Sequence, residues 1–432
     1  MNMGIFLKVL AIFVLVVLLV FACGYDDDDN DNDDVDDDDS GDDDDDDDTV
    51  VDDDTVVDDD DDNDIDITPP DGWQLEWVAS YDDVVFDPQL ALSPSGIPQI
   101  VFSYFPGGTD DPTLRYALPD GSAWDVFTVY EFTQGSGYYD FVLDGETPVI
   151  AYSRSAGNDY EHRQLVLTEL SGESWTEQIM QDVEFWVSDL SLLAGDETQV
   201  VYGDSGAWEG ADRAAVYHTF EEEKSWTTNE VFYGYSPVLH RNADGALQIV
   251  AFVDRNHLYA PEEQHGKLLL WEQADDDWSW EVIDDLDNYD VGGDCDALFI
   301  APKLGIDESD ETTVAYMLMT VYVNKALEEH YWYSVILARK SGDEWIPETY
   351  CENCGIGGYQ QNNTAVRRML IGYEDETVLA DDATGAWTEE TLSLPYGWMN
   401  YVVDENGYSH IAYAPTFEGQ AHDLYYLTNM PE

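Results

Sequence analysis

Aromatic residues that stand beside an acid or amide are the residues of this chain best suited to chemistry. They occur in the polar segments that separate repeated stretches, as Tyr81 with Asp83, Tyr139 with Asp140, Trp186 with Asp189, Tyr289 with Asp290, Tyr359 with Asn362, Trp398 with Asn400, and Tyr235 alone. Aromatic faces flanked by hydrogen-bonding groups suit stacking on sugar rings or holding an extended peptide. The candidate ligand-binding residues are therefore Tyr139, Asp140, Trp186, Asp189, Tyr235, Tyr289, Asp290, Tyr359 and Trp398. The alternative is that these side chains only pack between repeats.

Signatures of catalysis and of metal binding are absent from the sequence. There is no HExxH, no GxSxG and no phosphate-cradling glycine loop, and the eight histidines lack metal-ligand spacing. A pair of acids for glycoside hydrolysis cannot be chosen among so many carboxylates. The sequence therefore predicts no catalytic residue, no metal and no cofactor, and it favours a protein that is not an enzyme.

Three cysteines fall in two neighbouring segments of this kind, Cys295 in one and Cys351 and Cys354 in the next. In an exported protein a bridge from Cys295 to Cys351 or Cys354 would clip the two longest loops together. A Cys351–Cys354 bridge and a three-thiolate metal site are the alternatives. We favour the clip between loops.

The elements that position these residues recur along the chain. Tryptophans that follow a tight turn stand at Trp73, Trp124, Trp175, Trp226, Trp278, Trp345 and Trp387, with steps of 51, 51, 51, 52, 67 and 42 residues. Each opens a short alternating segment, and two apolar runs joined by a polar turn lie between successive tryptophans. Four short strands per unit at this period predict an all-β fold, a seven-bladed β-propeller over residues 71–432. A β-sandwich, the competing fold, has no reason to repeat at this period.

The last repeat contains three strands and lacks its tryptophan strand. The segment "GWQLEWVAS", Gly72 to Ser80, has the missing pattern and stands at the start of the repeats. We therefore expect this N-terminal strand to complete the last blade, which leaves no free edge between first and last blades. The tryptophans of the fourth strands are expected to fill the wedges between blades.

The N-terminal region predicts export. An apolar run from Val9 to Ala22 follows Lys8 and ends in "VFAC", a length that fits a signal peptide better than a membrane span. A small residue before a cysteine resembles the lipobox of bacterial lipoproteins. The resemblance implies that residues 1–22 are a signal peptide and that Cys23 carries a lipid anchor in the bacterial envelope, in the outer membrane or at the cell surface. An uncleaved anchor helix or an ordinary signal peptide is the alternative.

Residues 23–70 are predicted to be a disordered, acidic stalk. Between Asp26 and Asp66 there are 28 Asp and no Lys or Arg. Such a segment cannot bury apolar area and stays extended, and it attracts divalent cations only loosely. The rest of the chain has 67 Asp and Glu against 14 Lys and Arg outside the signal peptide, a formal charge of −53. This excludes nucleic acid and anionic membrane surfaces as partners and suggests a saline habitat.

The repeats resemble the BNR or Asp-box propellers of sialidase-like secreted proteins. An Asp-box lies in the turn before the fourth strand, where this chain has "LPDGSAW", "ELSGESW" and "DATGAW"; the tryptophan matches and the Ser-x-Asp-x-Gly spacing does not. We expect a monomeric binding or scaffold module for a glycan or an envelope protein. The alternative is a hydrolase or lyase of the sialidase-like type, in which Arg154, Arg255, Arg367 and Arg368 would hold a carboxylate.

Overall fold

The computed structural model divides the chain into two units, residues 1–64 and 65–432, and the described residues belong to the second. Described are residues 67–431, apart from 82–83, 107–110, 134–136, 158–161, 173, 184–185, 196, 206–213, 223, 243, 255–258, 275–276, 290–295, 307–311, 324–328, 343, 362–365, 374–375, 384–385, 396 and 416–422. The predicted signal peptide, Cys23 and the stalk as far as residue 66 lie outside them. No helix within the described residues has the length and apolar character needed to span a membrane.

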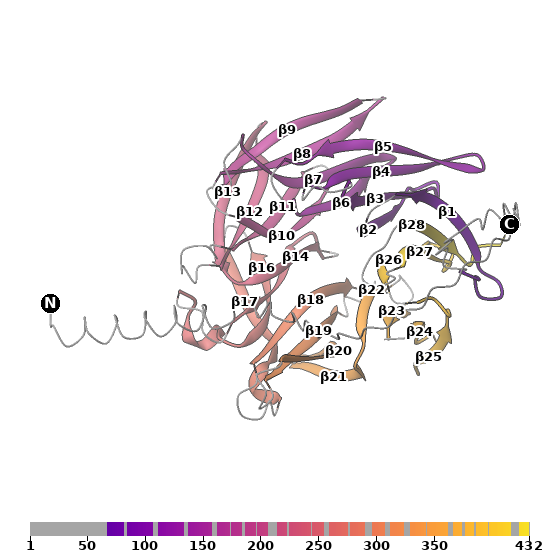
Figure 1. The fold of residues 1–432 in the computed structure, drawn as a ribbon. Helices are drawn as coiled ribbons and strands as arrows, with labels where there is room; N and C mark the ends of the chain where they lie inside the picture. The colour runs from indigo at the N-terminus through magenta and orange to yellow at the C-terminus, as the bar shows by residue number, and fades with distance from the viewer. Residues whose placement is uncertain are drawn as a thin grey trace, which may run out of the picture. The chain divides into compact units, whose positions relative to one another are not determined.

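The described strands form seven four-stranded antiparallel sheets, which confirms the predicted seven-bladed propeller (Figure 1). Blade 1 contains β2 (Val85–Leu92), β3 (Pro98–Tyr104), β4 (Thr113–Asp120) and β5 (Ala123–Glu131). Blade 2 contains β6 (Tyr139–Asp144), β7 (Thr147–Ser155), β8 (Arg163–Ser171) and β9 (Ser174–Val183). Blade 3 contains β10 (Trp186–Leu193), β11 (Gln199–Ser205), β12 (Ala214–Glu222) and β13 (Ser225–Tyr233).

The remaining blades continue this order. Blade 4 contains β14 (Tyr235–Arg241), β15 (Leu247–Val253), β16 (Lys267–Ala274) and β17 (Asp277–Asp285), with two short 3₁₀ helices, η1 (Glu262–Gln264) and η2 (Leu286–Asn288). Blade 5 contains β18 (Asp296–Ile306), β19 (Thr312–Val323), β20 (Glu329–Ser341) and β21 (Glu344–Glu352). Blade 6 contains β22 (Gly355–Gln361), β23 (Arg367–Gly372), β24 (Thr377–Asp381) and β25 (Thr388–Thr391).

Blade 7 takes its strands from both ends of the repeat region. Its order is β1-β28-β27-β26, with β26 (Gly397–Val403), β27 (Ser409–Pro415) and β28 (Asp423–Thr428) near the C-terminus and β1 (Gln74–Ser80) near the start. β1 pairs antiparallel with β28 from Gln74 opposite Thr428 to Ser80 opposite Asp423. The outermost strand of the last blade therefore precedes the first blade in the sequence.

The core is divided among the blades. Seven apolar clusters lie between neighbouring blades, and each contains one of the seven spaced tryptophans, Trp73, Trp124, Trp175, Trp226, Trp278, Trp345 or Trp387. Trp73 is 7 % exposed and donates its indole N–H to Glu390 of blade 6 over 2.9 Å. The tryptophans thus fill the wedges between the blades, as expected for a side chain repeated at one register.

Polar side chains join the innermost strands of successive blades. Asn400 accepts from the backbone N–H of Leu90 over 3.2 Å, Gln89 donates to the carbonyl of Tyr139 over 3.1 Å, Asp140 accepts from Leu192 over 2.7 Å and Ser191 accepts from Leu239 over 3.1 Å. These four side chains lie opposite Ala412, Val101, Ala151 and Val201, which are equivalent positions of the second strands. We call this register the polar ring.

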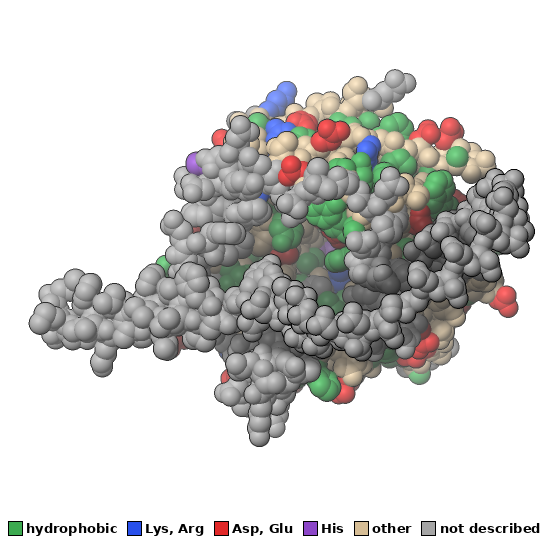
Figure 2. Space-filling model, in the orientation of Figure 1, with side chains coloured by type: hydrophobic (Ala, Val, Ile, Leu, Met, Phe, Trp, Pro, Cys, Tyr) green, Lys and Arg blue, Asp and Glu red, His purple; other side chains and the backbone are tan. Residues whose placement is uncertain are grey.

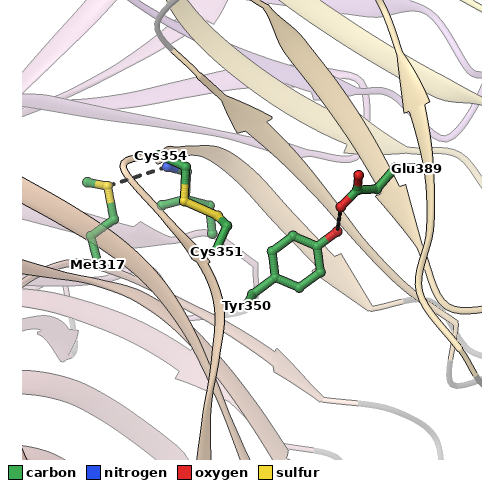
Figure 3. The surroundings of a disulfide bond; sticks show 6 residues. Met317, Tyr350, Cys351, Cys354 and Glu389 are labelled. Atoms are coloured by element: carbon green, nitrogen blue, oxygen red, sulfur yellow. Dashed lines mark hydrogen bonds between the residues drawn. A yellow bond between two sulfur atoms is a disulfide. The ribbon is translucent and has the colours of Figure 1, made fainter.

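The cysteines pair differently from the prediction. Cys351, at the end of β21, is bonded to Cys354, just before β22, and the Cα atoms are 6.3 Å apart (Figure 3). Asn353 between them has a φ of 55°, so the chain turns tightly enough for this local bridge. The predicted clip from Cys295 to Cys351 or Cys354 is wrong, because both partners are taken; Cys295 itself lies outside the described residues.

Candidate functional site at the mouth of the central channel

The innermost strands β2, β6, β10, β14, β18, β22 and β26 begin at the same face of the propeller and surround its centre (Figure 1). On the face seen in Figure 2, hydrophobic side chains surround a hollow near the middle. In β2, β10, β14, β18 and β22 a bulge interrupts the pairing with the second strand near this end. Bulges turn side chains out of the regular alternation, and they are frequent beside functional sites.

Asp87 is the side chain most exposed by such a bulge. It lies between Phe86 and Gln89, where the register shifts, and its φ of 51° is in the left-handed region that only a few residue types adopt. Its backbone carbonyl accepts from the hydroxyl of Tyr139. Its carboxylate is solvent-exposed and has no donor among the described residues.

The pKa of Asp87 is raised, because the surrounding protein removes water from its carboxylate, and Lys303 offsets part of this rise. Part of the Asp87 side chain is therefore exposed to solvent while protein atoms surround much of its carboxyl group. A carboxyl group with a raised pKa in a cleft is a candidate for proton transfer.

Burial raises the pKa values of two further carboxyl groups to about 6, those of Asp140, which interacts with Asp87, and of Asp189 in blade 3. Asp140 accepts from the backbone N–H groups of Phe141 and Leu192, which lower its pKa in part, while Asp87 raises it. Asp189 accepts from Ser236 over 3.5 Å, and hydrogen bonds from Ser188 and Ser236 limit its rise. Asp140 therefore joins blades 2 and 3, and Asp189 joins blades 3 and 4 through the backbone N–H and the hydroxyl of Ser236.

Lys303 occupies the polar-ring register of blade 5, opposite Ala315. Unlike Gln89, Asp140, Ser191 and Asn400, it joins no neighbouring blade: no hydrogen bond or ion pair connects it to another described residue. Its ammonium lowers the pKa of both Asp87 and Asp140. The ammonium of Lys303 therefore interacts with the carboxylates of Asp87 and Asp140, at a position that in other blades forms contacts between blades.

Two aromatic side chains flank Asp87. Tyr138 is 45 % exposed and Trp398 is 49 % exposed, in blades 2 and 7 on either side of blade 1. Burial raises the pKa of Tyr138, and the charges of Asp189 and Asp87 raise it further, so its hydroxyl is protonated and lies near both acids. We define the channel mouth as Asp87, Tyr138, Asp140, Asp189, Lys303 and Trp398.

The structure brings only part of the predicted ligand-binding set to the channel mouth. Asp140, Asp189 and Trp398 lie there. Tyr139 and Tyr359 are buried, 5 % and 6 % exposed. Asp290 and the side chain of Trp186 lie outside the described residues.

Tyr235 and Tyr289 belong to packing rather than to the channel mouth, since both are partly buried against the core between blades 4 and 5. Tyr289 donates its hydroxyl to the buried carboxylate of Asp284 over 2.5 Å, and Tyr316 donates to the same oxygen over 2.5 Å. This shared carboxylate fixes η2 against blade 5.

The arginines implied by the sialidase resemblance do not converge. Arg154 pairs with Glu177 over 2.7 Å in blade 2, and Arg368 pairs with Asp381 over 2.5 Å in blade 6. Arg367 pairs with Asp382, also in blade 6, and Arg255 lies outside the described residues. The described arginines therefore do not form the cluster that would clamp a carboxylate.

Sequence reasoning missed Asp87, Tyr138 and Lys303. Asp87 stands before a proline in "FDPQ", and Lys303 follows a proline in "APKL". A proline disrupts regular pairing in a strand and marks a bulge, so these two prolines were the available signal. Among the described residues, no group of three or more His, Cys, Asp or Glu is placed to hold a metal ion.

Comparisons with known proteins show the fold. No protein family and no curated protein matches the chain. The chain is similar to the structure of the α-L-arabinofuranosidase Arb93A of Fusarium graminearum, with 11 % identity, 82 % of this chain and 96 % of that chain covered, and a TM-score of 0.48. An α-L-arabinanase of Penicillium chrysogenum matches with 10 % identity, 84 % and 98 % coverage and a TM-score of 0.47. The NanB sialidase of Streptococcus pneumoniae matches with 10 % identity, 82 % and 70 % coverage and a TM-score of 0.43.

The prediction that the chain is not an enzyme drew a negative conclusion from missing motifs, and we withdraw it; the matched propellers include glycoside hydrolases. At such low identity the likeness extends to the fold alone. What the chain itself does has to be argued from the channel mouth.

Proposed function

We propose that the protein hydrolyses glycans at the channel mouth. The observation that carries the proposal is a set of three carboxyl groups with raised pKa values, in which Asp87 interacts with Asp140 and the half-exposed Tyr138 interacts with both Asp87 and Asp189. Glycoside hydrolysis needs one carboxylic acid that gives a proton to the leaving oxygen and a second carboxylate that acts as base or nucleophile.

Asp87 suits the role of the proton donor. Desolvation raises the pKa of its carboxyl group, no described residue donates a hydrogen bond to that group, and its left-handed backbone is the kind of strain that persists at functional positions. Asp189 suits the role of the second carboxylate, because the backbone N–H of Ser236 and the hydroxyls of Ser188 and Ser236 stabilise its charge. The hydroxyl of Tyr138 interacts with both Asp87 and Asp189. Asp140 has both oxygens occupied by backbone N–H groups, so we assign it to positioning.

The test is release of reducing ends from a panel of plant, fungal and bacterial polysaccharides by the purified protein, followed by single substitutions. We expect Asp87→Asn to lower the rate by about 10²–10⁴-fold, the usual contribution of a positioned acid. Asp189→Asn should lower it comparably. Asp125→Asn, on the exposed outer strand β5, is the matched control and should have no effect.

Two results would contradict the proposed function. One is an absence of hydrolysis across the panel by protein that melts cooperatively. The other is hydrolysis that Asp87→Asn and Asp189→Asn leave intact.

We also propose that the protein is exported and lipid-anchored through Cys23, on the apolar run before "VFAC". In a bacterial host, the full chain should partition with membranes, and Cys23→Ser should move it to the soluble fraction. The acyl group is detected by mass spectrometry of the N-terminal peptide. Membrane association that survives Cys23→Ser would instead indicate an uncleaved anchor helix.

A further inference from the structure

We propose that the channel mouth selects uncharged glycans and that Trp398 and Tyr138 hold sugar rings on either side of Asp87. The inference rests on the proposed function and narrows it to a substrate class. It goes against the resemblance to sialidases, which implies an acidic sugar.

The charge of the channel mouth argues against an anionic ligand. Three carboxyl groups, on Asp87, Asp140 and Asp189, share the site with a single cation, Lys303. That cation already interacts with two of them. Like charges repel one another more strongly when protein atoms surround them than in bulk water, and Asp87 raises the pKa of Asp140 in this way.

Five other described cations are engaged in ion pairs with acidic side chains. Arg154, Arg367 and Arg368 each have an acidic partner within their own blade. Arg339 pairs with Glu348 and Lys340 with Glu281, both on outer strands. A uronate, sialate or sulfate group would therefore meet carboxylates without a compensating clamp.

The aromatic side chains are arranged for two neighbouring rings. Trp398 lies opposite Ala414, Phe86 opposite Ser103, and the carbonyl of Tyr138 accepts from the N–H of Ser153 over 2.9 Å. The three partner residues occupy one position of the second strand, directly after a buried aromatic residue. The pairs are Tyr413 and Ala414, Phe102 and Ser103, and Tyr152 and Ser153. The three first-strand residues are therefore equivalent in blades 7, 1 and 2.

Asp87 directly follows Phe86 at the middle of this arc. Phe86 stacks on Phe105 with ring centroids 4.9 Å apart, whereas Tyr138 and Trp398 keep about half of their surface for a ligand. Large aromatic surfaces in a polar, half-open site suit the apolar faces of sugar rings. With one aromatic on each side of the acid, the ligand should contain at least two sugar units.

The experiment measures binding by the Asp87→Asn protein, so that chemistry does not consume the ligand. Tryptophan fluorescence and calorimetry are recorded with uncharged arabino-, xylo-, galacto- and gluco-oligosaccharides, and with oligogalacturonate and sialyllactose. We expect at least one uncharged series to bind and both charged probes to fail. Trp398→Ala should weaken binding by about tenfold, the loss of one stacking contact.

Trp77→Ala is the matched control, because Trp77 is 59 % exposed on the outermost strand β1, away from the channel mouth. It should leave affinity unchanged. In a protein that retains Asp87, Trp398→Ala should raise KM more than it lowers kcat. This result separates the binding of sugar rings from proton transfer.

The outcomes separate the two proposals. Preferential binding or hydrolysis of a charged probe overturns the inference and leaves the proposed hydrolase standing. Binding of an uncharged series that depends on Trp398, without any hydrolysis by the wild type, supports the inference and overturns the hydrolase. No binding by any probe overturns both.

Discussion

At the scale of residues, Asp140 shows how one side chain serves both the fold and the electrostatics of the channel mouth. Its two oxygens accept backbone N–H groups from its own blade and from blade 3. Burial nevertheless raises its pKa to about 6, which means that desolvation outweighs those bonds and the cation of Lys303. The charged form of Asp140 therefore costs the folded protein stability at neutral pH.

Replacing Asp140 by Asn should reveal this cost as a pH dependence. An unfolded Asp has a pKa of about 3.9, so between about pH 4 and 6 the folded state binds more protons and stability falls as pH rises. The stabilisation from the raised pKa is fully present below the pKa of Asp in the unfolded state. It is lost as the pH rises through the pKa of Asp140 in the folded state, about 6. Asn has no charge, so the stability of Asp140→Asn relative to the wild type should increase from pH 5 to pH 7.5.

Urea unfolding at the two pH values measures this difference. Asp125→Asn, which removes an exposed aspartate on the outer strand β5, should show no such trend. A relative stability of Asp140→Asn that does not change with pH would mean that Asp140 is not desolvated in solution.

Neighbouring residues also show where prediction from sequence ends. Tyr138 and Tyr139 are adjacent, and the sequence predicts only Tyr139 as a ligand-binding residue. In the structure Tyr139 is buried and Tyr138 is exposed. Successive residues of a strand point to opposite faces, so a shift of one residue exchanges the roles. The register depends on where strand pairing begins and on bulges such as the one at Asp87. The hydrophobic pattern of a single sequence determines neither of these.

At the scale of elements, the pattern sufficed to predict seven blades. The tryptophan spacing predicted the number of blades because each tryptophan belongs to a separate core cluster. The irregular steps also have structural causes. The step of 67 residues spans blade 5, where β19 and β20 have 12 and 13 residues, and the step of 42 spans blade 6, where β24 and β25 have 5 and 4.

Trp73 tests whether the N-terminal segment is part of the core. It contributes a buried ring to the cluster between blades 6 and 7 and a hydrogen bond to Glu390. Trp73→Ala should lower the free energy of unfolding by about 3–5 kcal/mol, as for other large core truncations. Trp77→Ala, four residues along the same segment but exposed, should change it little.

Chemical denaturation compares these two variants. If Trp73→Ala unfolds at the same denaturant concentration as the wild type, the N-terminal segment is not packed onto the last blade in solution. Should Trp73→Ala fail to fold, Trp73→Phe keeps the ring and loses the bond to Glu390, and should be only moderately destabilised.

At the scale of the whole molecule, the net negative charge opposes folding. The formal charge is −80 for the chain and −53 outside the signal peptide and the Asp-rich segment, and the described ion pairs are few. Self-repulsion of this kind favours the expanded state. It also explains why a channel mouth within this field suits an uncharged ligand better than an anion.

Salt should therefore stabilise the fold. The range of electrostatic repulsion falls to about 3 Å at 1 M salt, so the midpoint of thermal unfolding should rise by several degrees between low salt and about 0.5 M NaCl. The rise should level off once screening is complete, and KCl should reproduce it. A midpoint that stays constant up to 0.5 M and rises only at higher concentrations would point to general salting-out, and repulsion among the carboxylates would then not limit stability.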